Sequence, residues 1–171
     1  MNVIDRFQLR GIYGGTFDPI HYGHLRIAEE LLDLIGLEKI LFVPSGSPRL
    51  RADPSASRSQ RAAMVHLAIQ NNTRFLLDER EIKRLGISTS VQTLREYRLE
   101  WGESVALCLV LGIDAFIKLD QWSEWHELFN LCHLILVVRP GYMLPIDNHQ
   151  LPNAIRQELV SRYTHNIDTL A

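Results

Sequence analysis

A short segment near the N-terminus holds residue types that could bind a phosphate group. Starting at Gly14, it reads Gly-Gly-Thr-Phe-Asp-Pro-Ile-His-Tyr-Gly-His-Leu. The paired glycines carry no Cβ, so the backbone can lie directly against a phosphate, and Thr16 adds a hydroxyl. His21 and His24 are three residues apart, so both can face the same anion from one side of a helix. We therefore expect a small anion site in this segment.

The flanking sequence predicts a strand before the segment and a helix after it. The strand is the apolar run Leu9–Gly14, and the helix is His21–Ile35, where apolar residues recur at helical spacing. A helix that begins near residue 22 would present unpaired N–H groups and the positive end of its dipole to an anion. The segment would then lie where a strand meets a helix.

Simpler interpretations exist for each residue of the segment. A Gly-Gly pair alone usually marks a turn, and a single histidine near a helix start is more often a surface or core residue. Two histidines could bind zinc, but zinc takes three or four ligands and no Cys or His pair stands nearby, so we expect no metal site. The dinucleotide fingerprint and the P-loop are both absent. Taken together, however, nine positions of the segment are too many for coincidence: Gly14, Gly15, Thr16, Phe17, Asp18, Pro19, His21, Gly23 and His24.

The rest of the chain alternates between predicted strands and helices. This alternation, with apolar strands, predicts an α/β fold with a doubly wound parallel sheet of about five strands, in one domain over residues 1–171. Ligands of such folds bind beyond the carboxyl ends of the strands, here at Gly14, Pro44, Gly112 and Arg139. The further strands are expected at Lys39–Val43, Phe75–Leu77, Val105–Leu111 and Leu134–Val138. Helices are expected after the capping patterns Ser57-x-x-Gln60 and Thr89-x-x-Gln92. Short helical turns are expected at Ala115–Leu119 and Ser123–Phe129, and a last helix at Pro152–Tyr163.

The composition restricts the class of partner. The 171 residues include 18 Lys and Arg against 20 Asp and Glu, a formal net charge of −2, which argues against nucleic acid or a polybasic membrane anchor. Cys108 and Cys132 lie in apolar runs, as buried thiols of a reducing compartment do. The first ten residues lack the apolar centre of a signal peptide, and no apolar stretch approaches the roughly 18 residues of a membrane span. We expect a cytoplasmic protein.

The segment from Gly14 onward resembles the His-x-Gly-His signature of the nucleotidyltransferase superfamily, in the form found in bacterial nicotinate-mononucleotide adenylyltransferases. Later blocks resemble that family in the same order: Asp78-Glu79-Arg80-Glu81-Ile82, Gln92-Thr93-Leu94, Leu111-Gly112-x-Asp114 and Val138-Arg139-Pro140-Gly141. The resemblance covers most of the chain and implies a Rossmann-like nucleotidyltransferase fold. It also implies adenylyl transfer from ATP to nicotinate mononucleotide, which gives deamido-NAD and pyrophosphate in NAD biosynthesis.

The same resemblance implies roles for individual residues. His21, His24 and Thr16 would be the catalytic residues, because they would donate hydrogen bonds to the transferring phosphate. The nucleophile belongs to the substrate, and Mg²⁺ would be the cofactor, held mainly by ATP oxygens. ATP would be bound by Gly14, Gly15, Thr16, Phe17, His21, His24, Gly112, Asp114 and Arg139, and nicotinate mononucleotide by Asp18, Ser90 and Trp122. Two of these residues have structural alternatives: Asp114 as the N-cap of the helix at Ala115–Leu119, and Trp122 as a core or interface anchor.

The chain departs from the family pattern at several positions. Arg49 and Arg51 follow Pro44 where the family has Pro-Pro-His-Lys, so either Arg49 or Arg51 substitutes for those basic residues or the contact is lost. Ser90 and Ser123 stand where relatives usually have threonine and tyrosine. The family's closing Ile-Ser-x-Thr-x-Ile-Arg motif does not occur in residues 1–171. The resemblance therefore predicts a C-terminally shortened domain that could self-associate through an exposed apolar edge.

Two kinds of alternative stay open from the sequence. One keeps the chemistry and changes the acceptor: an adenylyl- or cytidylyltransferase acting on pantetheine-phosphate or nicotinamide mononucleotide. The other is a nucleotide-binding remnant without catalysis, which would bind ATP and release no pyrophosphate.

Overall fold

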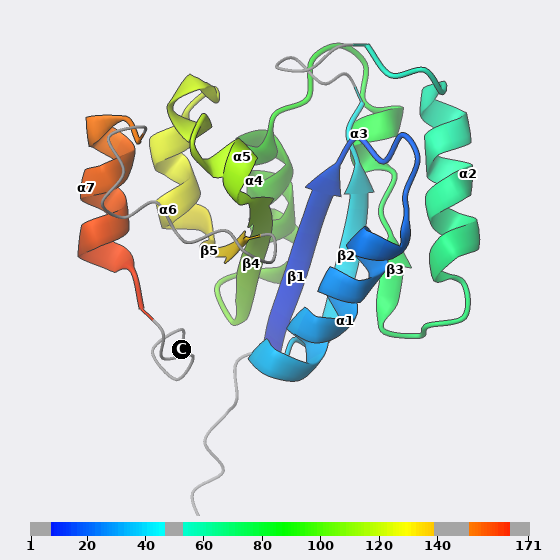
Figure 1. Cartoon of the computed structure of the whole chain (residues 1–171), viewed down its shortest axis with the longest axis horizontal. Coiled ribbons are helices and arrows are strands. Elements are labelled where there is room, and N and C mark those ends of the chain that lie inside the picture. The colour runs from blue at the N-terminus through cyan, green and yellow to red at the C-terminus, as the bar shows by residue number, and fades with distance from the viewer. Residues whose placement is uncertain (1–7, 47–52, 139–150, 165–171) are drawn as a thin grey trace, which may run out of the picture.

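The part of the chain that the computed structural model describes, residues 8–46, 53–138 and 151–164, is built around one parallel sheet (Figure 1). Its strand order is β3-β2-β1-β4-β5, and every neighbouring pair is parallel. The predicted α/β class and doubly wound topology are confirmed. The strands are β1 (Gln8–Gly15), β2 (Lys39–Pro44), β3 (Phe75–Leu77), β4 (Val105–Gly112) and β5 (His133–Val137).

The longer helices begin where the sequence predicts caps. Ser57 accepts a hydrogen bond from the N–H of Gln60 and forms the expected capping box, and Thr89 accepts one from the N–H of Gln92. The long helices are α1 (Tyr22–Ile35), α2 (Arg58–Ile69), α4 (Ser90–Trp101) and α7 (Asn153–Arg162). The short ones are α3 (Arg80–Lys83), α5 (Ile113–Phe116), η1 (Leu119–Gln121), η2 (Trp125–Glu127) and α6 (Leu128–Leu131).

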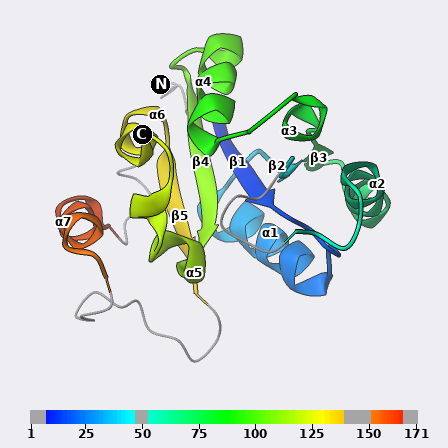
Figure 2. The same cartoon turned by 90° about the horizontal axis from the view of Figure 1, so that it is seen from above.

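Helices cover both faces of the sheet, and each face has its own core. Figure 2 shows α1 and α4 on opposite sides of the strands. Neighbouring residues of β1 separate accordingly: Ile12 packs in the cluster that includes α4, and Tyr13 packs in the cluster that includes α1. This is why β4 reads as a continuous apolar run, since its side chains are buried on both faces.

The chain order creates one break in the direction of winding, between β1 and β4. From β1 the chain proceeds to β2 and then β3, and it returns across the sheet to place β4 on the other side of β1. In open α/β sheets, ligands bind at this switch point, beyond the carboxyl ends of the two strands. Here those ends are Gly14–Gly15 and Gly112, as the sequence predicts.

Among the described residues, none of the helices has both the length and the apolar character that crossing a membrane requires.

Candidate active site

The two histidines cap the first helix, and their rings contact each other at a tilt of 31°. The Nδ1 atom of His21 accepts a hydrogen bond from the N–H of Gly23 at 3.2 Å, and Nδ1 of His24 accepts one from the N–H of His21 at 3.2 Å. The ring centroids are 3.9 Å apart. Because both Nδ1 atoms accept hydrogen bonds from backbone N–H groups, each neutral ring carries its own proton on Nε2, which is then a hydrogen-bond donor.

This capping corrects one prediction about the helix start. The sequence predicts that unpaired N–H groups at this helix start are available to an anion, and the structure pairs those of His21 and Gly23 with imidazole nitrogens. Polar side chains at a helix start compete for those donors because they would otherwise be unsatisfied. The Nε2–H groups of the two rings are therefore donors that this helix start can direct at a phosphate.

Buried aromatic rings hold His24 in place. Its ring lies edge-on to Phe17, with centroids 5.2 Å apart, and 6.1 Å from Tyr13. Burial raises the pKa of Tyr13 to about 12, so its hydroxyl stays neutral. Phe17 has φ 50° and is only 3% exposed, and a Cβ on Gly15 would come within 2.9 Å of its ring. Phe17, expected to bind ATP, thus lies beneath the site, and Gly15 is required for this close packing.

Gly14 and Gly112 leave an open space at the switch point. A Cβ built on either residue would have no atom within 4 Å, and both residues are exposed. They end the neighbouring strands β1 and β4. A ligand can therefore approach both backbones without meeting a side chain at these positions.

Gly112 also corrects the structural alternative for Asp114. Helix α5 begins at Ile113 and its N-cap is Gly112, so Asp114 is the second residue of the helix and not its cap. The prediction of a helix at Ala115–Leu119 placed its start two residues too late, because the glycine that ends the strand also begins the helix. The Asp114 side chain is exposed beside the open space.

Asp18, predicted to bind the acceptor, also has a structural role. Its two carboxylate oxygens accept hydrogen bonds from the N–H groups of Ser55 and Ala56, at 2.6 and 3.1 Å. These two residues directly precede the cap of α2. Asp18 therefore fastens the loop that enters α2 to the histidine segment.

Arg61 is a buried cation at this edge of the sheet that the sequence did not single out. Its side chain donates to the carbonyl oxygens of Thr16 and Ser45, each at 2.7 Å, and of Gly46 at 3.3 Å. Burial lowers the pKa of its guanidinium, and the nearby Asp18 opposes that shift. A signal was available: Arg61 lies four residues before Val65, on the buried side of α2, where a charge is unusual.

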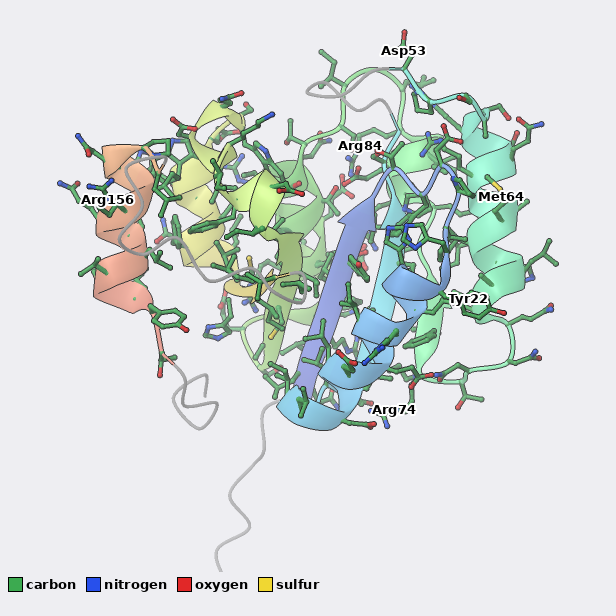
Figure 3. The ribbon with its side chains drawn as sticks, in the orientation of Figure 1. Tyr22, Asp53, Met64, Arg74, Arg84 and Arg156 are labelled. Atoms are coloured by element: carbon green, nitrogen blue, oxygen red, sulfur yellow. The ribbon has the colours of Figure 1, made fainter. Side chains whose placement is uncertain are left out.

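A polar network fixes the start of α4, where Ser90 lies. Arg84 pairs with Glu96 at 2.7 Å and also contacts Ser88, and Glu81 accepts a hydrogen bond from Thr93 at 2.7 Å. In Figure 3, Arg84 lies in the upper part of the molecule, at the level of the carboxyl ends of β1 and β2. Burial raises the pKa of the Glu81 carboxyl, although Thr93 and Arg84 oppose the shift. The network holds α3 against α4 and so places the segment that ends at Ser90.

Asp78, at the other end of this network, has the opposite pKa shift. Burial would raise its pKa, but hydrogen bonds from Arg80 and from the hydroxyl of Tyr97 outweigh burial and lower it. Arg80 also pairs with Glu100 at 3.0 Å. The Asp-x-Arg-Glu block that resembles the family therefore supports the site and lies outside the open space itself.

Trp122, the other residue expected to bind the acceptor, is half-buried against the core. Two residues later, Glu124 has φ 55° and pairs with Arg95 of α4 at 2.7 Å. Because Ser90 is the first residue of that same helix, the Arg95–Glu124 pair connects the two segments expected to meet the acceptor.

Some predicted residues lie outside the described part of the chain. These are Arg49, Arg51 and Arg139, so the predictions for them stay predictions. Within residues 8–46, 53–138 and 151–164, no three His, Cys, Asp or Glu side chains are grouped to hold a metal ion. The structure brings His21, His24, Thr16, Gly14 and Gly112 to one edge of the sheet.

Comparison with known proteins first defines the class. The cytidylyltransferase-like family model matches residues 12–163. The nicotinate-nucleotide adenylyltransferase of Escherichia coli O6:H1 (strain CFT073) is 41% identical over 163 residues, which cover 95% of this chain and 75% of the relative. A Halorhodospira halophila protein named a probable nicotinate-nucleotide adenylyltransferase is 43% identical over 155 residues, covering 91% of this chain and 68% of that protein. The chain therefore belongs to the nicotinate-nucleotide adenylyltransferases of the cytidylyltransferase-like family.

Solved structures agree on the fold. The Plasmodium falciparum nicotinic acid mononucleotide adenylyltransferase complexed with NaAD superposes with a TM-score of 0.71 at 18% identity, covering 88% of this chain and 71% of that one. The same enzyme complexed with APC gives a TM-score of 0.62 at 15% identity, covering 90% of this chain and 95% of that one. The Rossmann-like nucleotidyltransferase fold is thus confirmed.

Proposed function

We propose that the protein transfers the adenylyl group of ATP to the phosphate of nicotinate mononucleotide, giving deamido-NAD and pyrophosphate. The observation that carries the proposal is the pair of helix-capping histidines, His21 and His24, beside the open space at Gly14 and Gly112. The family membership supports the same reaction. The acceptor phosphate is itself the nucleophile, so the protein has to orient two phosphates and stabilise charge.

In this reaction an oxygen of the acceptor phosphate attacks the α-phosphorus of ATP. The new P–O bond forms as the bond from the α-phosphorus to the bridging oxygen breaks, and the electron pair leaves with pyrophosphate. The Nε2–H groups of His21 and His24 donate to the oxygens that gain charge, and the Thr16 hydroxyl donates beside them. Fixed donors of this kind typically contribute about 10²–10³-fold each to the rate.

The phosphate chain of ATP lies over Gly14 and Gly112, where a side chain would obstruct it. Mg²⁺ enters with ATP as part of the substrate, held by phosphate oxygens and water. Asp114 contacts the nucleotide from the end of β4, and the family resemblance adds Arg139, which lies outside the described residues. These placements rest on the open space and on the order of the strand ends.

The acceptor lies on the α4 side of the site. Trp122 packs against the pyridine ring, and Ser90 contacts it from the start of α4. The Arg95–Glu124 pair supports this arrangement because it holds the two segments together. A cytoplasmic protein with small-molecule substrates and no membrane or nucleic-acid partner fits the charge and composition.

The reaction is tested by incubating the purified protein with ATP, Mg²⁺ and one acceptor at a time. The acceptors are nicotinate mononucleotide, nicotinamide mononucleotide and pantetheine-phosphate, with CTP replacing ATP in a parallel series. Pyrophosphate release is measured and the dinucleotide product is identified by mass. We expect kcat/KM to be highest with ATP and nicotinate mononucleotide. A higher kcat/KM with another nucleotide and acceptor would show that they are the substrates instead. ATP binding without pyrophosphate release would indicate a non-catalytic module.

A further inference from the structure

Arg61 is 1% exposed, which is rare for an arginine without a carboxylate partner. Among the described residues, no carboxylate oxygen lies within ion-pair distance of its guanidinium; the acceptors are the carbonyls of Thr16, Ser45 and Gly46. Thr16 follows β1, and the other two residues follow β2. One buried cation thus bridges the two loops that leave the neighbouring strands at the site.

These hydrogen bonds determine where the adjoining N–H groups point. In a trans peptide the C=O and N–H bonds point in opposite directions. Since the carbonyls of Thr16 and Ser45 face Arg61, the N–H groups of Phe17 and Gly46 face away from it. Neither N–H donates to a protein acceptor within the described residues. Backbone N–H groups that face away from a buried positive charge, and that have no protein acceptor within the described residues, suit an anion.

Further contacts hold the loops after β1 and β2 close to each other around the guanidinium of Arg61. The N–H of Ser45 donates to the carbonyl of Gly15 at 2.8 Å, which joins the ends of β1 and β2. A Cβ on Gly46 would overlap the carbonyl oxygen of Glu81. These contacts fix where the two loops lie, and the hydrogen bonds from Arg61 fix the direction of their peptide groups.

We propose that Arg61 is a positioning residue for the phosphate chain of ATP, because it turns the loops after β1 and β2 so that their N–H groups and the Thr16 hydroxyl meet the phosphates. This rests on the proposed function only for the identity of the nucleotide. A lysine cannot replace it, because one ammonium cannot reproduce the planar fork that reaches carbonyls in both loops.

The chain supplies a matched control in Arg98 of α4. Arg98 also donates to three backbone carbonyls, those of Leu131, Gly102 and Val105, at 2.9, 3.0 and 2.7 Å. Val105 begins β4, so Arg98 lies at the opposite edge of the sheet from the site. Its replacement removes a comparable set of hydrogen bonds without touching the phosphate loops.

The test compares Arg61→Lys and Arg61→Met with Arg98→Lys and Arg98→Met in the full protein. All four should lower the melting temperature. Only the Arg61 variants should reduce kcat/KM for ATP, by about 10²-fold, while the KM for the acceptor changes less than threefold. Unchanged ATP kinetics in Arg61→Lys, or an equal loss in the folded Arg98 variants, would overturn the proposal.

Equilibrium binding separates this inference from the reaction itself. By calorimetry, Arg61→Lys should weaken ATP at least tenfold and AMP by less than threefold, since AMP lacks the β- and γ-phosphates. If the wild-type protein binds ATP and transfers nothing, the proposed reaction is wrong and this comparison still decides the role of Arg61. Equal weakening of ATP and AMP would overturn the role, because the effect would then not concern the phosphate chain.

Discussion

His21 has two roles in the structure, and two substitutions separate them. Its Nδ1 caps α1 through the N–H of Gly23, and its Nε2–H is a donor of the proposed site. His21→Ala removes both roles. His21→Ser keeps a side-chain oxygen that can accept a hydrogen bond at the cap and removes only the imidazole. The melting temperature should depend on whether the capping hydrogen bond is kept, and kcat should depend on whether the imidazole ring is present.

The expected magnitudes follow from those contacts. Loss of a helix cap costs about 1 kcal/mol, which for a chain of this length lowers the melting temperature by about 2–4 °C. His21→Ala should show that shift, and His21→Ser should lie within about 1–2 °C of wild type. Both should lose about 10²–10³-fold in kcat, because both lack the Nε2–H donor.

Two measurements check this prediction: thermal melting by circular dichroism and pyrophosphate release at saturating ATP and nicotinate mononucleotide. If His21→Ser melts like wild type and also turns over like wild type, the ring has only a capping role and the proposed catalysis by His21 is refuted. A loss of turnover in His21→Ala alone, recovered in His21→Ser, would have the same meaning.

The other predictions concern the supporting network, the open space and the acceptor. Asp78→Asn should cost about 1–3 kcal/mol near pH 7 and less as the pH falls below about 4, because the lowered pKa of Asp78 stabilises the fold only above that pH. Glu81→Gln should gain stability relative to wild type as the pH rises above about 4, because the raised pKa of Glu81 favours its neutral form. Urea unfolding measures the free energy of unfolding against pH, and a variant whose pH profile runs parallel to that of wild type would contradict its prediction. Gly14→Ala and Gly112→Ala should melt within about 1–2 °C of wild type, because a Cβ at either position meets no protein atom. By calorimetry, both variants should bind ATP at least tenfold more weakly. Unchanged ATP affinity would place the phosphates elsewhere. Trp122→Leu should raise the KM for nicotinate mononucleotide and leave that for ATP unchanged; equal rises in both would assign Trp122 to the core instead.

The sequence predicts the helices and strands that have a regular apolar pattern or a clear capping residue. Helix α1 has regular apolar spacing, α2 and α4 have side-chain caps, and β4 is continuously apolar because both of its faces are covered. Helix α3 is four residues long, which is too short to show a helical period. The short helices after β4 are predicted, but their ends differ from those in the structure. Their boundaries depend on Gly112 and on packing against the core, which a local pattern does not show.

The candidate site divides in the same way. His21, His24 and the glycines could be found because they lie together in one segment that resembles a family signature. The roles of Asp18 and Arg61 depend on contacts with residues 37 and 45 positions away in the chain. Such contacts follow from the packing of α2 against the strand ends, and no local pattern encodes them. Arg61 left a weak signal, a charge on the buried side of its helix.

The proposed site is tested most directly by a crystal structure of the protein with a non-hydrolysable ATP analogue and Mg²⁺. We expect phosphate oxygens within about 3 Å of Nε2 of His21 and His24, with the phosphate chain over Gly14 and Gly112. A nucleotide whose phosphates contact neither imidazole, for example one bound in the groove beside Met64, would contradict the proposed role of the histidine pair.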